Sequence, residues 1–222
     1  MKDYKYILFD LDGTLTEPKE GITKSVAYAL KYYGIHVEDL DTLCPFIGPP
    51  LKESFMKFYG FDDAKAEEAV EKYREYFRPH GVYENEMYEG IPELLQMLKK
   101  QGKVIVLATS KPTVFANIIL EHFHLKSYFD CIVGSELDGT RVRKDEVITY
   151  ALQQMCIRDK REVVMIGDRE HDILGAKANG LASIGVLYGH GNLEELQKAG
   201  ADKIVETVQE LALSLDKSAI QG

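Results

Sequence analysis

Short apolar runs alternate with segments of helical periodicity over most of the chain. The apolar runs predict buried strands at 6–9, 104–108, 131–133, 163–166, 182–186 and 204–205. Apolar residues spaced three or four apart predict the intervening helices at 92–100, 113–123, 145–156, 172–179 and 207–215. Continuous apolar strands that alternate with helices are typical of a parallel sheet covered on both faces. We therefore expect an α/β fold with a doubly wound parallel sheet.

One long segment breaks this alternation, because from about Pro18 to Tyr88 the pattern is helical and gives no convincing strand. Apolar positions predict helices from Ile22 to Tyr33, from Leu51 to Phe58 and from Ala66 to Phe77. The sequence thus predicts an α/β core of residues 1–17 and 89–222, interrupted by a small helical cap of residues 18–88. In doubly wound sheets ligands bind beyond the carboxyl ends of the strands, so an insert after the first strand can cover the site.

Composition narrows the classes of protein that fit. The chain has 222 residues, 45% of them hydrophobic, and a formal net charge of -9, which argues against a partner that is a nucleic acid polymer. Its 3 cysteines form no C-x-x-C pair, which favours a reducing, cytoplasmic compartment. No apolar run has the length of a membrane span. The sequence does not indicate the oligomeric state.

Acidic residues follow two of the predicted strands. Asp10 comes directly after the first strand and Asp12 lies two residues on, so in extended geometry both side chains leave the same side of the backbone. Asp168 follows the strand at 163–166, and Asp172 lies one helical turn later. If these strands are neighbours, the carboxylates converge and require protonation or a cation. Carboxylate oxygens with few nitrogen or sulfur neighbours favour Mg²⁺.

Groups that could bind a phosphate stand at further points of the same framework. Thr109 and Ser110 end the second core strand with hydroxyl and backbone N–H donors, and Lys144 lies just before a predicted helix. Each feature alone has an ordinary structural interpretation as a turn residue, a helix cap or a solvated charge, and Asp172 could be only the N-cap of its helix. The order of the features along the chain favours phosphoryl transfer.

At these residues the sequence resembles the haloacid dehalogenase-like superfamily, in its phosphatase branch. Asp10-Leu11-Asp12-Gly13-Thr14 looks like the first family motif, Thr109 like the second, Lys144 like the third, and the segment from Gly167 to Asp172 like the fourth. The helical insert resembles the family's four-helix cap. Within it, a segment that includes Phe46, Ile47, Gly48 and Pro49 is similar to phosphoglycolate phosphatase-like and 5′-nucleotidase-like members.

The resemblance implies a Mg²⁺-dependent phosphatase for a small phosphorylated metabolite, either phosphoglycolate or a nucleoside 5′-monophosphate. By the same resemblance Asp10 attacks phosphorus to form an aspartyl-phosphate, and Asp12 is the general acid and base. Asp10, the backbone carbonyl of Asp12 and Asp168 would hold Mg²⁺, with Asp172 as a supporting acid. Thr109, Ser110 and Lys144 would bind the phosphate, and Phe46, Ile47, Gly48 and Pro49 the rest of the substrate.

Other functions and contacts stay open at the level of sequence. A hexose-phosphate mutase of the same family would share the core motifs, and a non-enzymatic phospho-acceptor switch would share the strand-end acids, the hydroxyl and the lysine. The helical insert and Asp12 count against the switch. Whether Arg78 or Lys111 contacts the substrate is also open.

Overall fold

The computed structural model describes residues 3–216. The chain folds into two compact units, of which the first contains residues 1–17 and 87–222 and the second Pro18–Glu86. The two connecting segments carry the short strands β2 (Thr16–Glu17) and β3 (Glu86–Met87), which pair with each other. The pairing gives a strand at Glu86–Met87, where the sequence analysis expected none.

The first unit is built on a parallel sheet with strand order β5-β4-β1-β6-β7-β8. Its strands are β1 (Tyr6–Phe9), β4 (Val104–Pro112), β5 (Cys131–Ser135), β6 (Val163–Gly167), β7 (Ala182–Val186) and β8 (Lys203–Val205). The central strand β1 lies between β4 and β6, with Phe9 opposite Leu107 on one side and Ile166 on the other. This arrangement confirms the doubly wound α/β fold.

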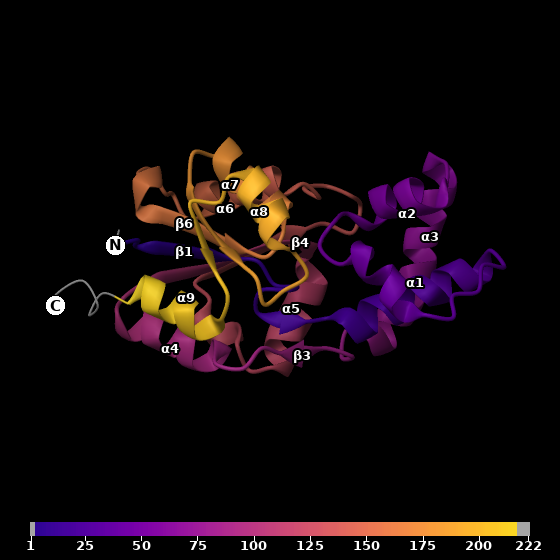
Figure 1. Ribbon diagram of the computed structural model, residues 1–222, viewed down its shortest axis with the longest axis horizontal. Coiled ribbons are helices and arrows are strands. Elements are labelled where there is room, and N and C mark those ends of the chain that lie inside the picture. The colour runs from indigo at the N-terminus through magenta and orange to yellow at the C-terminus, as the bar shows by residue number, and fades with distance from the viewer. Residues whose placement is uncertain (1–2, 217–222) are drawn as a thin grey trace. The chain divides into compact units, whose positions relative to one another are not determined.

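Helices cover both faces of this sheet (Figure 1). One face carries α6 (Lys144–Gln154), α7 (Glu170–Ala178) and α8 (Leu193–Ala199), and the other carries α4 (Ile91–Lys100), α5 (Thr113–His122) and α9 (Val208–Leu215). Two short 3₁₀ turns, Lys126–Tyr128 and Lys160–Glu162, precede β5 and β6. Burial on both faces explains why the strands are continuous apolar runs: Ile7, Leu8 and Phe9 are all 0% exposed.

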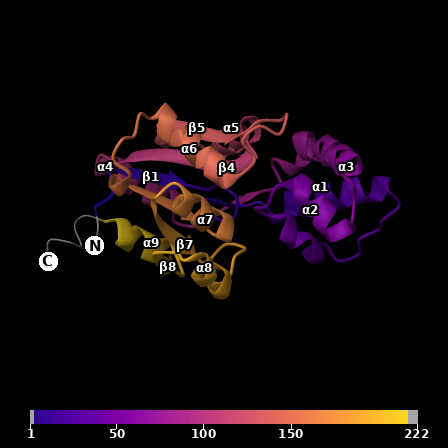
Figure 2. The same cartoon turned by 90° about the horizontal axis from the view of Figure 1, so that it is seen from above.

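The second unit contains α1 (Lys19–Tyr32), α2 (Leu51–Tyr59) and α3 (Asp63–Tyr76), all labelled in Figure 2. A 3₁₀ segment, Leu40–Phe46, lies between α1 and α2, and a π-helical turn, Phe77–Gly81, follows α3. Helix α2 ends at Gly60, whose φ of 64° suits glycine, and Asp62 caps α3 by accepting a hydrogen bond from the Lys65 N–H.

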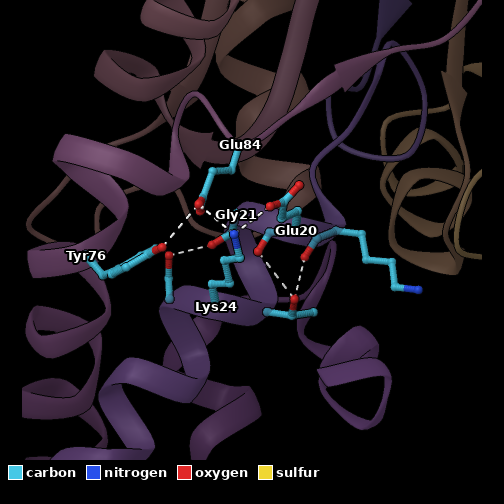
Figure 3. A network of polar contacts seen from close by, with 8 residues as sticks. Glu20, Gly21, Lys24, Tyr76 and Glu84 are labelled. Atoms are coloured by element: carbon cyan, nitrogen blue, oxygen red, sulfur yellow. Dashed lines mark hydrogen bonds and ion pairs between the residues drawn. The ribbon is translucent and has the colours of Figure 1, made fainter. Parts of the chain in front are cut away.

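A polar network joins the beginning of α1 to the chain that leaves this helical unit (Figure 3). The Lys24 ammonium group lies 2.5 Å from Glu20 Oε1 and 2.8 Å from Glu84 Oε1. The Tyr76 hydroxyl also donates to Glu84 Oε1, at 3.1 Å, and the Gly21 N–H donates to the Glu84 carbonyl at 2.9 Å. These contacts join the first turns of α1 to residues near the end of the unit.

Among the described helices, none combines the length and apolarity needed to cross a lipid bilayer. The three cysteines, Cys44, Cys131 and Cys156, are free thiols.

Candidate active site

The sheet topology brings the two acidic motifs to one point. Asp10 follows β1 and Asp168 follows β6, and these strands are hydrogen-bonded neighbours in parallel register. The Asp10 N–H continues the ladder by donating to the Ile166 carbonyl at 2.9 Å. The carboxyl ends of adjacent parallel strands share one edge of the sheet, where α/β proteins bind their ligands.

Three carboxyl groups meet there. Asp10, Asp168 and Asp172 each offer an oxygen, and these oxygens lie within 4.8 Å of one another. All three residues are buried, with 4%, 0% and 1% of their surface exposed. Asp172 reaches the cluster from the first turn of α7, where its Oδ2 accepts a hydrogen bond from the Arg169 N–H at 3.1 Å. It therefore completes a capping box and also faces the other carboxylates, so its two sequence-level interpretations are compatible.

Lys144 is the cation of this cluster. It is the first residue of α6, and its buried ammonium group lies 2.7 Å from Asp10 Oδ1 and 2.8 Å from Asp172 Oδ1. The same group donates to the Ala108 carbonyl of β4 at 3.1 Å. Burial alone would lower the pKa of Lys144, but Asp10 and Asp172 raise it above its usual value, so the side chain stays charged.

A second buried ion pair lies beside the first. The Lys111 ammonium group is 2.7 Å from Asp12 Oδ2, and the two side chains are 6% and 10% exposed. Lys111 comes from the end of β4, where the register with β5 shifts between Ala108 and Pro112. Burial raises the pKa of the Asp12 carboxyl, while the ammonium group of Lys111 limits that rise.

Thr109 and Ser110 lie in the same irregular end of β4. The Thr109 side chain is buried and its Oγ1 accepts a hydrogen bond from the Lys111 N–H at 3.3 Å. The Ser110 carbonyl accepts from the hydroxyl of Ser135 at 2.8 Å. Neither residue caps α5, whose N-cap is Pro112. Thr109 is thus placed in the same strand end as Lys111 and next to Ala108, which Lys144 contacts.

Acidic side chains outnumber basic side chains in this site. Within residues 3–216, the contacts just described set the carboxyl groups of Asp10, Asp12, Asp168 and Asp172 against the ammonium groups of Lys111 and Lys144. Burial, followed by the charges of Asp172 and Asp10, raises the pKa of Asp168 well above its usual range. Burial also raises the pKa of Asp172, to about 6, against the lowering effect of Lys144. Full ionisation would leave an excess of two negative charges.

The donor set fits a divalent cation bound through oxygen. In the described part of the chain, the buried Oδ1 of Asp168 has no hydrogen-bond partner, so this oxygen is available to a cation. Gly13 leaves room for this carboxylate, because a Cβ at that position would lie 2.2 Å from Asp168 Oδ2 and 2.8 Å from Oδ1, and its φ of 78° disfavours other residues. Hard oxygen donors without nitrogen or sulfur are the ligands that Mg²⁺ prefers.

The residues expected to contact the rest of the substrate belong to the helical unit. The Phe46 ring packs at 5.0 Å from the ring of Phe55 and at 5.5 Å from that of Phe58, inside an aromatic cluster of that unit. Ile47 is fully buried, whereas Gly48 and Pro49 are partly exposed. Arg78, the other cap residue considered, is exposed. A role of these residues in substrate binding stays a prediction.

Comparisons with known proteins agree with the fold and the motifs. The family model described as haloacid dehalogenase-like hydrolase matches residues 7–186. The chain belongs to this family. It is 54% identical to a 5′-nucleotidase of Pseudomonas aeruginosa over 194 residues, which are 87% of either protein. It is 36% identical to a tyrosine-protein kinase of Mycobacterium tuberculosis over 211 residues, covering 94% of this chain and 72% of that protein.

Solved structures of this family show the same architecture. The crystal structure of a predicted phosphatase from Clostridium acetobutylicum superposes with a TM-score of 0.94 at 54% identity, covering 96% of this chain and 99% of the other. Together with the family membership, this likeness confirms the expectation that the chain is a phosphatase of the haloacid dehalogenase-like family.

Proposed function

We propose that this phosphatase hydrolyses a small phosphate monoester with the help of Mg²⁺, through an aspartyl-phosphate formed on Asp10. The observation that carries the proposal is the buried cluster of Asp10, Asp168 and Asp172, whose oxygens lie within 4.8 Å of one another beside the charged Lys144. One Mg²⁺ carries two positive charges and would balance the excess of two negative charges in the site. The ion would be held by the carboxylates of Asp10 and Asp168 and by the backbone carbonyl of Asp12. When bound, it would neutralise charge on carboxylate and phosphate oxygens.

In the first step an oxygen of the Asp10 carboxylate attacks phosphorus, and the bond from phosphorus to the ester oxygen breaks. The leaving oxygen takes a proton from Asp12, whose raised pKa suits a general acid. Asp12 then removes a proton from water, which attacks the phosphorus of the aspartyl-phosphate. This second displacement releases inorganic phosphate and restores the Asp10 carboxylate, so one hard displacement is divided into two.

The residues around Asp10 and Asp12 bind and orient the phosphate. Thr109 and Ser110 supply hydroxyl and N–H donors at the end of β4, and Lys144 supplies a positive charge for the equatorial phosphate oxygens. Asp172 holds Lys144 in place through the 2.8 Å ion pair. It is therefore a supporting acid: it acts on the phosphate through the lysine.

A nucleoside 5′-monophosphate is the proposed substrate. The 54% identical relative over 87% of the chain is named a 5′-nucleotidase. Solved structures named phosphoglycolate phosphatase share 23% and 21% identity with this chain, which is a likeness of fold alone. Phosphoglycolate is accordingly the comparison substrate, and selectivity between the two would come from groups outside the phosphate.

The test is release of inorganic phosphate by the purified full chain from nucleoside 5′-monophosphates, phosphoglycolate, a hexose 1-phosphate and p-nitrophenyl phosphate. We expect the highest kcat/KM for a nucleoside 5′-monophosphate, with one phosphate released for each alcohol formed. A mutase would instead convert the hexose phosphate to its isomer, a switch would stop after one turnover, and a kinase would transfer phosphate from ATP to a tyrosine side chain.

Metal dependence is measured in the same assay. Excess EDTA should abolish turnover, Mg²⁺ should restore it, and Ca²⁺ should restore it poorly because it takes more ligands at longer distances. Full activity of the wild-type protein in excess EDTA would contradict the metal-dependent mechanism.

A further inference from the structure

The loop that follows β7 lies directly on the candidate metal site. The His190 N–H donates a 2.8 Å hydrogen bond to Asp168 Oδ2, and the Tyr188 hydroxyl donates to the Thr14 carbonyl at 3.1 Å. Between them, a Cβ at Gly189 would lie 2.2 Å from the Gly13 carbonyl oxygen and 2.5 Å from Asp168 Cβ. The loop is thus in backbone contact with both acidic motifs, and a bulkier residue than Gly189 would push it away.

The side chains of His190 and Tyr188 in the same loop contact Glu17 and Tyr88. The His190 imidazole places Nε2 at 2.8 Å from Glu17 Oε1. The Tyr88 hydroxyl donates to the other oxygen of that carboxylate, Glu17 Oε2, at 3.0 Å. The Tyr88 ring also meets the ring of Tyr188 edge to face, with 5.1 Å between centroids. The His190 side chain is 13% exposed and that of Glu17 is 31% exposed, so the bond between them is partly shielded from water.

Glu17 and Tyr88 mark the two places where the chain passes between its units. Glu17 ends β2, one residue before the helical unit begins, and Tyr88 follows β3, two residues after that unit ends. We call these two strands, with Tyr88, the connecting strands. A continuous series of hydrogen bonds therefore runs from Asp168 through the backbone and the imidazole of His190 to Glu17 and on to Tyr88. Every residue of the series belongs to the α/β unit.

We propose that His190 is a positioning residue that couples metal binding at Asp168 to the order of the connecting strands. The inference rests on the metal site of the proposed function and goes beyond it. An imidazole bonded to Glu17 fixes the loop whose N–H holds Oδ2 of Asp168, so the unpartnered Oδ1 of that carboxylate stays available to a cation. Residues that orient a metal ligand without touching the metal affect its affinity strongly. Linkage makes the effect reciprocal, so bound metal also orders the connecting strands.

The first measurement is the Kd of the full chain for Mg²⁺ by titration calorimetry. His190→Ala should raise the Kd by about tenfold or more, as is typical when a group that orients a metal ligand is lost. His190→Gln, whose amide can still donate to Glu17, should rescue most of the affinity and stay within about threefold of wild type. Tyr88→Phe keeps the ring and loses only the hydroxyl bond to Glu17, so we expect a smaller rise. His122→Ala, at an exposed histidine of the same unit, is the matched control and should leave the Kd unchanged.

The second measurement is amide hydrogen exchange with and without Mg²⁺. In wild type the ion should slow exchange in the connecting strands, and in His190→Ala this protection should be lost while the interior strands keep theirs. If wild type binds Mg²⁺ but His190→Ala and Tyr88→Phe bind it equally well and show the same protection, the coupling is refuted and the proposed function stands. If wild type itself binds no Mg²⁺, the metal site of the proposed function fails, and the coupling fails with it.

Discussion

The ammonium group of Lys111 lies 2.7 Å from Oδ2 of Asp12, and both side chains are buried. Asp12 is the proposed acid and base, and this ion pair affects its pKa. Burial raises the pKa of Asp12, and Lys111 limits the rise. In the second half of the reaction Asp12 must be ionised to accept a proton from water. The lysine therefore determines how far towards acid pH the enzyme can work.

Lys111→Met should shift the acidic limb of the pH profile of kcat to higher pH. Without the ammonium group the pKa of Asp12 rises further, so the base is available only in more alkaline solution. At neutral pH we expect kcat to fall by about 10- to 100-fold, because an impaired base loses only part of the roughly 10²- to 10⁴-fold that general acid–base catalysis contributes. The control is Lys99→Met, which removes a partly exposed lysine paired with Asp130, and it should leave the profile in place. An unmoved acidic limb in Lys111→Met would show that the pair has no part in the chemistry.

Much of the fold follows from the sequence because its strands are buried on both faces. The sequence of such a strand is a continuous apolar run, and β1, β6 and β7 lie where those runs predict them. The polar end of β4, from Thr109 to Pro112, has no such signature, since it continues through a shift of register. The prediction therefore ended that strand too early.

Among the small elements that the sequence analysis did not predict, α8 and β3 escaped it for different reasons. Helix α8 has only 7 residues, too few for a clear period, although Asn192 and Glu195 mark its beginning by a side-chain cap. The strand Glu86–Met87 has 2 residues and forms only by pairing with Thr16–Glu17, so no local pattern announces it.

The acidic cluster could be predicted and its surroundings could not. Asp10 and Asp168 follow apolar strands, and neighbouring strand ends bring them together. The contact of His190 with Glu17 joins residues 173 positions apart in the sequence, and it depends on how a loop folds back over the site. The ion pair of Lys111 with Asp12 depends in turn on the irregular end of β4, which only the structure reveals.

Asp168→Asn should stabilise the metal-free protein at alkaline pH. Burial and the charges of Asp172 and Asp10 raise the pKa of Asp168 well above its usual value. An acid with a raised folded pKa contributes stability that is present below its unfolded pKa, about 4, and lost as the pH rises through the folded pKa. In EDTA, wild type should therefore lose stability between about pH 5 and pH 8, and the uncharged variant should lose less.

The measurement is Tm by calorimetry at both pH values, with and without Mg²⁺. Asp168→Asn should melt above wild type at pH 8 in EDTA, by a margin that shrinks at pH 5, and Mg²⁺ should raise the Tm of wild type but not that of Asp168→Asn. Glu194→Gln, at an exposed carboxylate paired with Lys198, is the control and should follow wild type. If Asp168→Asn melted below wild type at pH 8 in EDTA, the ionised carboxylate of Asp168 would not destabilise the metal-free protein.

Pro49→Ala should change substrate preference without unfolding the helical unit. Phe46 packs among the rings of Phe55 and Phe58, so Phe46→Ala would cost about 3–5 kcal/mol of stability and confound any effect on selectivity. Pro49 is partly exposed in the same segment, and its ring restricts the loop.

We expect Pro49→Ala to shift the ratio of kcat/KM for a nucleoside 5′-monophosphate to that for phosphoglycolate by about threefold or more, at nearly constant Tm. Pro79→Ala alters an exposed proline of the same unit and should leave the ratio unchanged. Equal ratios in wild type and both variants would place the determinants of selectivity outside the segment from Phe46 to Pro49.

The most direct test of the account is mass spectrometry of the covalent intermediate. Asp12→Asn removes the base that completes hydrolysis, while p-nitrophenyl phosphate has a leaving group that needs little help from an acid, so the aspartyl-phosphate should accumulate. After an acid quench of this variant with substrate and Mg²⁺, we predict one added phosphoryl group on the peptide that contains Asp10. Asp10→Asn, which keeps the shape and loses the nucleophile, should carry none and should retain less than about a hundredth of wild-type turnover. An Asp10→Asn protein that keeps a tenth or more of that turnover, or a phosphoryl group found on another residue, would contradict the account.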